Sequence, residues 1–157
     1  MGIKTVAIYS TIDSHSLHVR LADESWCVGP PSISSSYLNM DSILNAAIST
    51  NSQAVHPGYG FLSENYKFVD LLESNGLVFI GPGSNAIKLM GDKIQSKLLA
   101  RNANVNTIPG YLGVISDEMH AFDIANEIGY PIMIKASAGG GGKGMRITND
   151  HEQVSTL

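Results

Sequence analysis

The chain has 157 residues, of which 43% are hydrophobic and 15% charged, and its formal net charge is −4 at pH 7. This length fits one domain or slightly more, and the composition is typical of a folded globular chain rather than of a disordered one. The mild charge argues against nucleic acid or an anionic membrane as the main partner, and the single cysteine excludes an internal disulfide and a multi-cysteine zinc site.

The first 80 residues predict strands that alternate with helices, which is the pattern of a parallel α/β sheet. We expect strands at 5–9, 26–28, 53–55 and 77–80, and helical segments at 16–21, 38–48 and 64–73. Serines at 34–36 and Ser63 are the expected N-caps of the last two helices. No apolar run approaches the roughly 18 residues that a membrane span needs.

A change in composition near Gly91 predicts a domain boundary, with one domain at 1–91 and a second at 92–157. Asp92 is a candidate N-cap for a helix over 93–102, and another helix is expected from 117 to 128, ended by Gly129. Strands at 131–136 and 145–148 flank a run of glycines. Because the glycine run joins strand to strand, these two strands are expected to form an antiparallel hairpin.

The glycine run is the most informative feature: Gly139 to Gly142 are consecutive, and Gly144 follows Lys143. Glycines that cluster in a packed domain indicate close approach to a ligand or a loop that moves, and bare amides beside lysines favour phosphate. A dinucleotide fingerprint would need a helix after the loop, and the Walker A pattern does not fit. A glycine hairpin that folds over phosphates, as in kinases and ATP-grasp enzymes, is the remaining functional reading, with a ligand-free surface loop as its alternative.

Two lysines are candidate phosphate ligands. Lys135 shares a strand face with Met133, so its ammonium could reach the groove under the glycine run or extend into water. Lys93 lies in the first turn of its predicted helix, where a cation opposes the helix dipole. That unfavourable position suggests a phosphate nearby, although a solvated lysine explains it equally well.

The segment His-Pro-Gly-Tyr-Gly-Phe-Leu-Ser-Glu-Asn at 56–65 follows a predicted parallel strand. Ligands bind α/β sheets at the carboxyl ends of such strands, and Tyr59 offers a hydroxyl group and a flat ring. A tight turn with a capping box at Ser63 explains the same residues without a ligand. The histidines have no metal-ligand spacing, and no Ser/His/Asp or Cys/His nucleophile arrangement is present.

Four motifs, in this order along the chain, resemble the biotin carboxylase module of biotin-dependent carboxylases. They are the segment at 56–65, Phe-Ile-Gly-Pro-Gly at 79–83, Met-Gly-Asp-Lys at 90–93 and the glycine-rich segment at 134–145. The match covers essentially the whole chain. Within the family, segments 1–10, 105–110 and 127–131 are most similar to alpha subunits of propionyl-CoA carboxylases.

The resemblance implies an α/β fold: an incomplete Rossmann-like (pre-ATP-grasp) parallel sheet domain, then the start of an ATP-grasp domain with a glycine-rich β-hairpin lid. It implies a ligase that carboxylates biotin with bicarbonate and cleaves ATP. Tyr59 and Gly60 would lie near biotin, and this stretch would carry no catalytic or metal-binding residue. The residues implied to bind ATP are Lys93, Lys135, Gly139, Gly140, Gly141, Gly142 and Gly144.

The family pattern begins one strand earlier and continues into a larger lobe, which implies a stretch truncated at both ends and inactive alone. Biotin and Mg²⁺ are implied for the full-length family, whereas ATP binding is the part expected here. The implied partners are bicarbonate, a biotinylated carrier domain and a carboxyltransferase (beta) subunit, and the implied compartment is the mitochondrial matrix. Two alternatives stay open: another ATP-grasp ligase such as a carbamoyl-phosphate synthetase, and a non-catalytic truncated isoform or interaction fragment.

Overall fold

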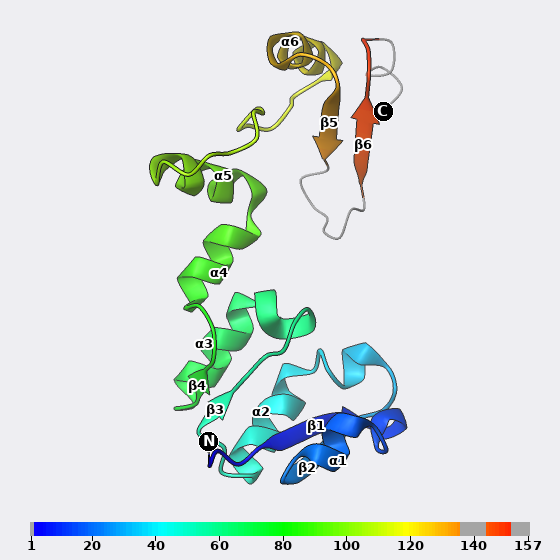
Figure 1. Cartoon of the computed structure of the whole chain (residues 1–157), viewed down its shortest axis with the longest axis vertical. Coiled ribbons are helices and arrows are strands. Elements are labelled where there is room, and N and C mark those ends of the chain that lie inside the picture. The colour runs from blue at the N-terminus through cyan, green and yellow to red at the C-terminus, as the bar shows by residue number, and fades with distance from the viewer. Residues whose placement is uncertain (1, 136–143, 152–157) are drawn as a thin grey trace. The chain divides into compact units, whose positions relative to one another are not determined.

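The computed structural model describes residues 2–135 and 144–151. They belong to two compact units, Met1–Gly91 and Asp92–Leu157 (Figure 1). Among the described residues, no helix is both long and apolar enough to cross a membrane.

Parallel strand pairs organise the first unit, as the alternation of strands and helices predicted. Strand β1 (Val6–Ser10) pairs with β2 (Glu24–Gly29), and β3 (Ala54–Val55) pairs with β4 (Val78–Phe79). Among the described residues these pairs form two separate two-stranded sheets. The connecting elements are the 3₁₀ helices η1 (Thr11–Asp13), η2 (Ile33–Ser35) and η3 (Phe61–Glu64), and the α-helices α1 (Leu17–Leu21), α2 (Met40–Ser49), α3 (Tyr66–Ser74) and α4 (Ser84–Gly91).

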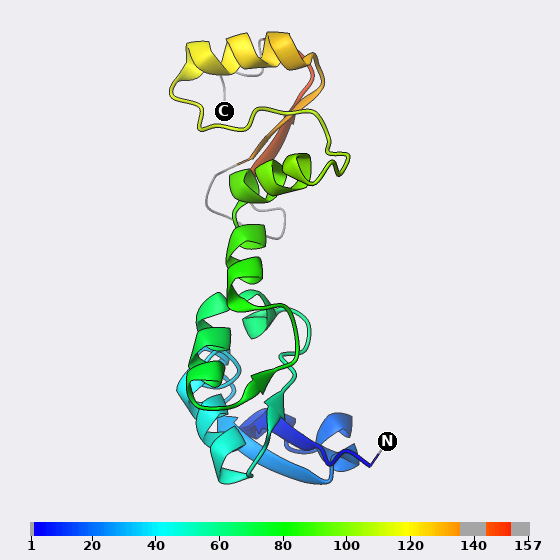
Figure 2. The same ribbon diagram turned by 90° about the vertical axis from the view of Figure 1, so that its left-hand side faces the viewer.

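One hydrophobic core joins both strand pairs to the helices. Helix α3 buries Phe68, Val69 and Leu72, a spacing that places all three on one helix face. Val28 of β2 and Phe79 of β4 belong to the same core cluster. Helices α2 and α3 lie on one side of the strands and α1 lies on the other (Figure 2). The two strand pairs are therefore held in one unit by shared side-chain packing.

The N-cap of α2 differs from the prediction. Asn39 caps this helix by accepting a hydrogen bond from the Ser42 amide at 3.0 Å. The serines that were expected to cap it lie in and after η2, where the Ser36 hydroxyl donates to the Ser32 carbonyl at 2.7 Å. A serine that bonds its own turn is no longer available to a helix end four residues later.

The N-cap of α3 was also predicted wrongly. Asn65 accepts from the Lys67 amide at 3.0 Å, and the helix begins at Tyr66. Ser63 lies inside η3, whose backbone already turns before the α-helix starts. A 3₁₀ turn is a frequent element before an α-helix, and it moved the true cap two residues along the chain.

The second unit contains α5 (Lys93–Asn102), α6 (Glu118–Ile128), β5 (Ile132–Lys135) and β6 (Met145–Thr148). Strands β5 and β6 pair in antiparallel fashion, so the predicted antiparallel pairing of these two strands is confirmed. The predicted N-cap of α5 is confirmed, because Asp92 accepts from the amides of this helix. Helix α6 begins one residue later than predicted, because Asp117 is its N-cap and accepts from the His120 amide at 2.8 Å.

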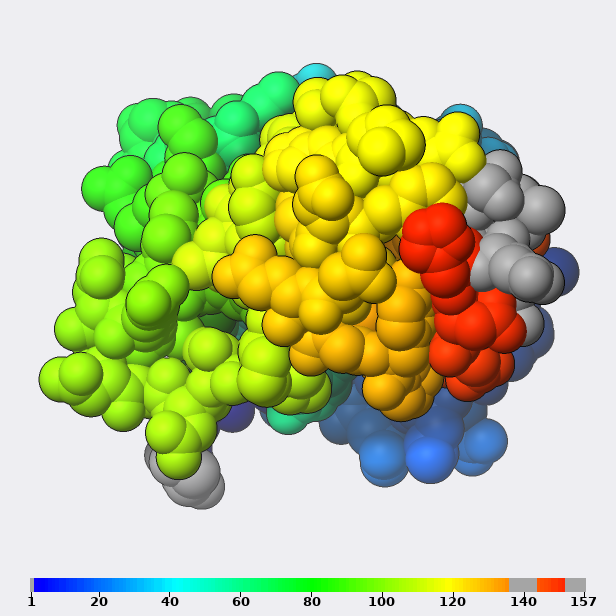
Figure 3. All heavy atoms as spheres, turned by 90° about the horizontal axis from the view of Figure 1, so that it is seen from above, coloured from blue at the N-terminus to red at the C-terminus, as the bar shows by residue number. Residues whose placement is uncertain are grey.

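The turn after β6 packs against α6. The ring of His151 stacks on Phe122 of α6, with the centroids 3.9 Å apart and the planes at 12°. Figure 3 shows the red residues of β6 and this turn beside the yellow and orange residues of α6 and β5. Ile124 and Ala125 of α6 and Thr148 of β6 are the buried side chains of this unit among the described residues.

Candidate nucleotide site

One face of the β5–β6 hairpin combines a lysine with exposed apolar side chains. In the register of the two strands Lys135 lies opposite Met145, and Met133 lies opposite Ile147. Directly opposed residues share a face of the sheet, and residues two apart on one strand also share it. The hairpin face thus consists of Lys135, Met133, Met145 and Ile147.

These apolar side chains are open to solvent: Met133 is 48% exposed, Met145 43% and Ile147 61%. The alternate residues Ile132 and Ile134 on β5 are half-buried, so the two faces of the hairpin differ. A contiguous exposed apolar face is uncommon on a folded surface and indicates a binding surface. Methionines suit a flat aromatic ligand because their side chains are polarisable and adapt in shape.

Lys93 is the first residue of α5, as predicted. Asp92 accepts hydrogen bonds from the amides of Ile94 at 2.9 Å and Gln95 at 2.8 Å. Because the Asp92 carboxylate occupies these amides, a phosphate at this helix end would be bound by the Lys93 ammonium rather than by both amides.

The glycine run falls largely outside the described residues. Gly139, Gly140, Gly141 and Gly142 are not described, whereas Gly144 lies immediately before β6 with a φ of 72°. This left-handed backbone is readily accessible to glycine, which explains the glycine at the entrance to the second strand of the hairpin.

The predicted biotin-proximal residues lie in the first unit, after β3. Tyr59 is 96% exposed, and its ring meets His56 edge-on at 6.4 Å. Gly58 and Gly60 have φ values of 74° and 75°, and the Gly58 amide donates to His56 Nδ1 at 3.0 Å. This backbone presents Tyr59 outward from the carboxyl end of a parallel strand, which agrees with the position expected from the sequence.

A polar group that the sequence analysis did not single out lies at the carboxyl end of β1. The Asp13 carboxylate accepts hydrogen bonds from the Ser10 hydroxyl and the Tyr37 hydroxyl, each at 2.6 Å. Donation from Ser10 and then from Tyr37 lowers the pKa of Asp13. Burial, and then the bond to Asp13, raises the pKa of Tyr37. The parallel-strand rule could have drawn attention to Asp13, but no spacing links it to Tyr37.

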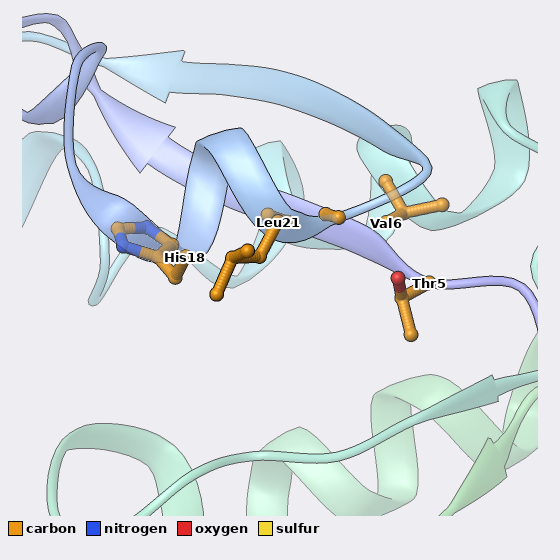
Figure 4. A pocket seen from close by; sticks show the side chains of 6 residues that line it. Thr5, Val6, His18 and Leu21 are labelled. Carbon is orange, nitrogen blue, oxygen red and sulfur yellow. The ribbon is translucent and has the colours of Figure 1, made fainter.

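A pocket in the first unit lies apart from the predicted site residues. The pocket is lined by residues of β1 and α1 and by a neighbour of each element. Figure 4 shows His18 and Leu21 of α1 projecting to the side on which Thr5 lies. None of the residues predicted to bind ATP or biotin lines it. In the described part of the chain, no group of three or more His, Cys, Asp or Glu residues could hold a metal ion.

Comparison with known families assigns both halves of the chain. Residues 1–87 match the family described as "Biotin carboxylase, N-terminal domain", and residues 92–157 match "Carbamoyl-phosphate synthase L chain, ATP binding domain". The chain belongs to the biotin carboxylase family. Another ATP-grasp ligase is not favoured, since the first match covers more than half of the chain and is described as a biotin carboxylase domain.

Curated biotin carboxylase relatives support the finer resemblance. The mitochondrial propionyl-CoA carboxylase alpha chains of Sus scrofa and Homo sapiens are each 63% identical over 98% of this chain. The propionyl-CoA carboxylase alpha chain of the bacterium Ruegeria pomeroyi is 59% identical over 97%. The chain spans 21% of the length of the two mammalian relatives and 22% of the bacterial one. The predicted similarity to propionyl-CoA carboxylase alpha chains is confirmed.

Solved biotin carboxylases have the same fold. A Campylobacter jejuni biotin carboxylase in a "beta-gamma-ATP" complex has a TM-score of 0.91 and 40% identity, and it covers 99% of this chain. A biotin carboxylase domain from Hydrogenobacter thermophilus, in complex with MgADP, ADP and bicarbonate, has a TM-score of 0.89 and 47% identity over 99% of this chain. The chain covers 35% and 34% of these structures. The α/β fold with an ATP-grasp-type domain is thereby confirmed.

Proposed function

We infer that this chain supplies nucleotide-binding residues of a biotin carboxylase that joins bicarbonate to biotin at the expense of ATP. In this reaction a bicarbonate oxygen attacks the γ-phosphorus and ADP leaves. The resulting carboxyphosphate gives its carboxyl group to a biotin nitrogen, and the phosphate released takes up the proton that this nitrogen loses. The family assignment supports the inference. Relatives solved with MgADP, bicarbonate and an ATP analogue support it as well.

The observation that carries the proposal is the hairpin face with Lys135. The purine ring of a nucleotide needs a flat apolar surface, and the phosphates of the same nucleotide need a cation within reach of that surface. Met133, Met145 and Ile147 offer the surface, and the long Lys135 side chain offers the cation at its edge. Both features lie on two adjacent strands, so the proposal does not depend on the placement of the undescribed glycines.

Further residues have proposed roles that follow from their chemistry. Lys93 would hold a phosphate through its ammonium group, because Asp92 already occupies two amides at the start of α5. The undescribed Gly139–Gly142 run and Gly144 would form a lid that closes over the phosphates and excludes water. Tyr59 and Gly60 would lie beside the ureido ring of biotin. Mg²⁺ would neutralise phosphate charge, and the described residues offer no ligand set for it.

The proposed partners follow from the same family. Bicarbonate is the carboxyl donor, a biotinylated carrier domain brings biotin, and a carboxyltransferase (beta) subunit uses the product. The mitochondrial matrix is the proposed compartment, supported by the names of the mammalian relatives. Relatives also occur in bacteria, among them Ruegeria pomeroyi and a Nostoc species.

Calorimetric titration of MgATP into the purified chain tests the proposal. The Lys135→Met variant keeps the apolar stem and removes the charge, so we expect affinity to fall about 10- to 100-fold, the equivalent of one charge-assisted hydrogen bond. Lys67→Met is the matched control, because Lys67 is an exposed lysine of the first unit. Equal affinities for all three proteins, or equal losses in both variants, would contradict the assignment of Lys135.

A further inference from the structure

The Tyr37 hydroxyl is held in a fixed orientation by two hydrogen bonds. It donates to Asp13 Oδ2 at 2.6 Å and accepts from the Ser10 amide at 2.9 Å. The Ser10 hydroxyl donates to the same carboxylate oxygen, and Ser10 is 1% exposed. A phenol that both donates and accepts has little rotational freedom, so the end of β1 fixes the Tyr37 ring.

The Tyr37 ring in turn contacts Phe61. The two rings are stacked, with centroids 5.8 Å apart and planes at 23°. Phe61 has a φ of 45°, a left-handed backbone that is an outlier for a bulky residue and persists only where surrounding contacts enforce it. The side chain of Phe61 is 57% exposed, so it has few other contacts that could enforce this conformation.

Phe61 closes the turn that carries Tyr59. Leu62, the next residue, is 4% exposed and anchors the chain in the core, whereas Gly58, Tyr59 and Gly60 are all exposed. The direction of the turn is therefore set at Phe61, between the buried anchor and the exposed tip. A ring held at this point acts on Tyr59 through the backbone rather than by touching a ligand.

We propose that Tyr37, fixed by Asp13 and Ser10, is a positioning residue that holds the turn at 58–61 and so aims Tyr59 at its ligand. The identity of that ligand, the biotin ring, rests on the proposed function. Tyr37 would contribute to binding without direct contact, and its hydroxyl would matter as much as its ring.

Fluorine NMR of the whole chain labelled with para-fluorophenylalanine tests this role. The sequence has four phenylalanines, and the Phe61 resonance is assigned by its loss in Phe61→Leu. Each Tyr→Phe variant adds a fifth fluorinated ring, whose resonance is recognised because the unsubstituted chain lacks it. We expect Tyr37→Phe and Asp13→Asn to shift or broaden the Phe61 resonance and to leave those of the core residues Phe68 and Phe79 unchanged. In Tyr66→Phe, the matched control, the hydroxyl removed makes no hydrogen bond among the described residues, and the Phe61 resonance should stay in place.

A pH titration of the labelled chain without substitutions gives a second readout, with two variants as controls. Hydrogen bonds from Ser10 and Tyr37 lower the pKa of Asp13, and the nearby His18 charge acts in the same direction. The network is therefore intact at neutral pH and is lost as pH falls through this lowered pKa, below about pH 4. The Phe61 resonance should move in that range, should still move in His18→Gln, and should not move in Asp13→Asn.

Free biotin, added to the same labelled chain, separates the two proposals. A Phe61 resonance that responds to Tyr37→Phe and to acid supports the positioning role, and a biotin-induced shift that is lost in Tyr37→Phe supports it further. If Phe61 responds to both but not to biotin, the positioning role stands and the assignment of biotin to this turn fails. A Phe61 resonance indifferent to Tyr37→Phe, Asp13→Asn and acid overturns the positioning role, whatever biotin does.

Discussion

Replacing Gly29 with alanine is expected to destabilise the first unit by roughly 3 kcal/mol, a large loss for a small domain. Gly29 ends β2 with a φ of 148°, and an added Cβ would overlap the backbone carbonyl oxygen of Ser35. Ser36, the next residue, is fully buried and bonded to Ser32, so the loop cannot easily move aside. The chain must then strain either the end of β2 or this loop.

Urea unfolding followed by Trp26 fluorescence measures this effect. Trp26 is the only tryptophan and lies on β2, three residues before Gly29, so its emission reports on the first unit. Gly76→Ala is the matched control: its φ is 76°, but an added Cβ would meet no atom within 4 Å. The control should be destabilised by only about 1–2 kcal/mol, which is the cost of placing alanine in a left-handed backbone conformation. Equal losses in both variants would show that the Ser35 contact contributes nothing.

The sequence predicted local structure best where one residue type decided it. Helix α5 has the predicted bounds because Asp92 is the single strong cap before it, and β6 has the predicted bounds because Gly144 precedes it. Alternation along β5 also placed Lys135 beside Met133 on the exposed face. Such features depend on neighbours within a few residues, which a sequence displays directly.

The incorrect cap predictions arose where several residues compete. Serine and asparagine have nearly equal preference for the N-cap, so the pattern alone could not choose between the serines before α2 and Asn39. The choice depends on Ser36, which is buried and bonded to the turn before it. Burial of this kind is set by tertiary packing and has no local signal.

Contacts between distant segments could not be predicted at all. Strand directions followed from the alternation of strands and helices, but which strands pair with each other had no local signal, because pairing partners lie far apart in the chain. The same holds for Asp13 and Tyr37, which are 24 residues apart and are joined only by the fold. Sequence reasoning thus named candidate ligand-binding residues such as Tyr59, and it missed the contact between Asp13 and Tyr37.

Truncation of Phe68 to alanine is expected to give the largest loss of all, about 3–5 kcal/mol. Phe68 is 1% exposed on the inner face of α3, and its ring meets the ring of Phe79 edge-on at 6.3 Å. Removing it would leave a cavity between α3 and β4, because its neighbours Val69 and Leu72 are already fully buried and cannot collapse into the space.

Urea unfolding followed by Trp26 fluorescence again measures the effect. The control is Glu73→Ala, on the exposed side of the same helix, which should change stability by less than about 0.5 kcal/mol. The double variant Phe68→Ala/Phe79→Ala tests the reason: the two rings are in contact, so their losses should be less than additive by about 0.5–1.5 kcal/mol. Full additivity would mean that α3 and β4 are stabilised by separate contacts. Coupling would show that this aromatic pair joins the helix layer to the β3–β4 sheet, on which the turn carrying Tyr59 depends.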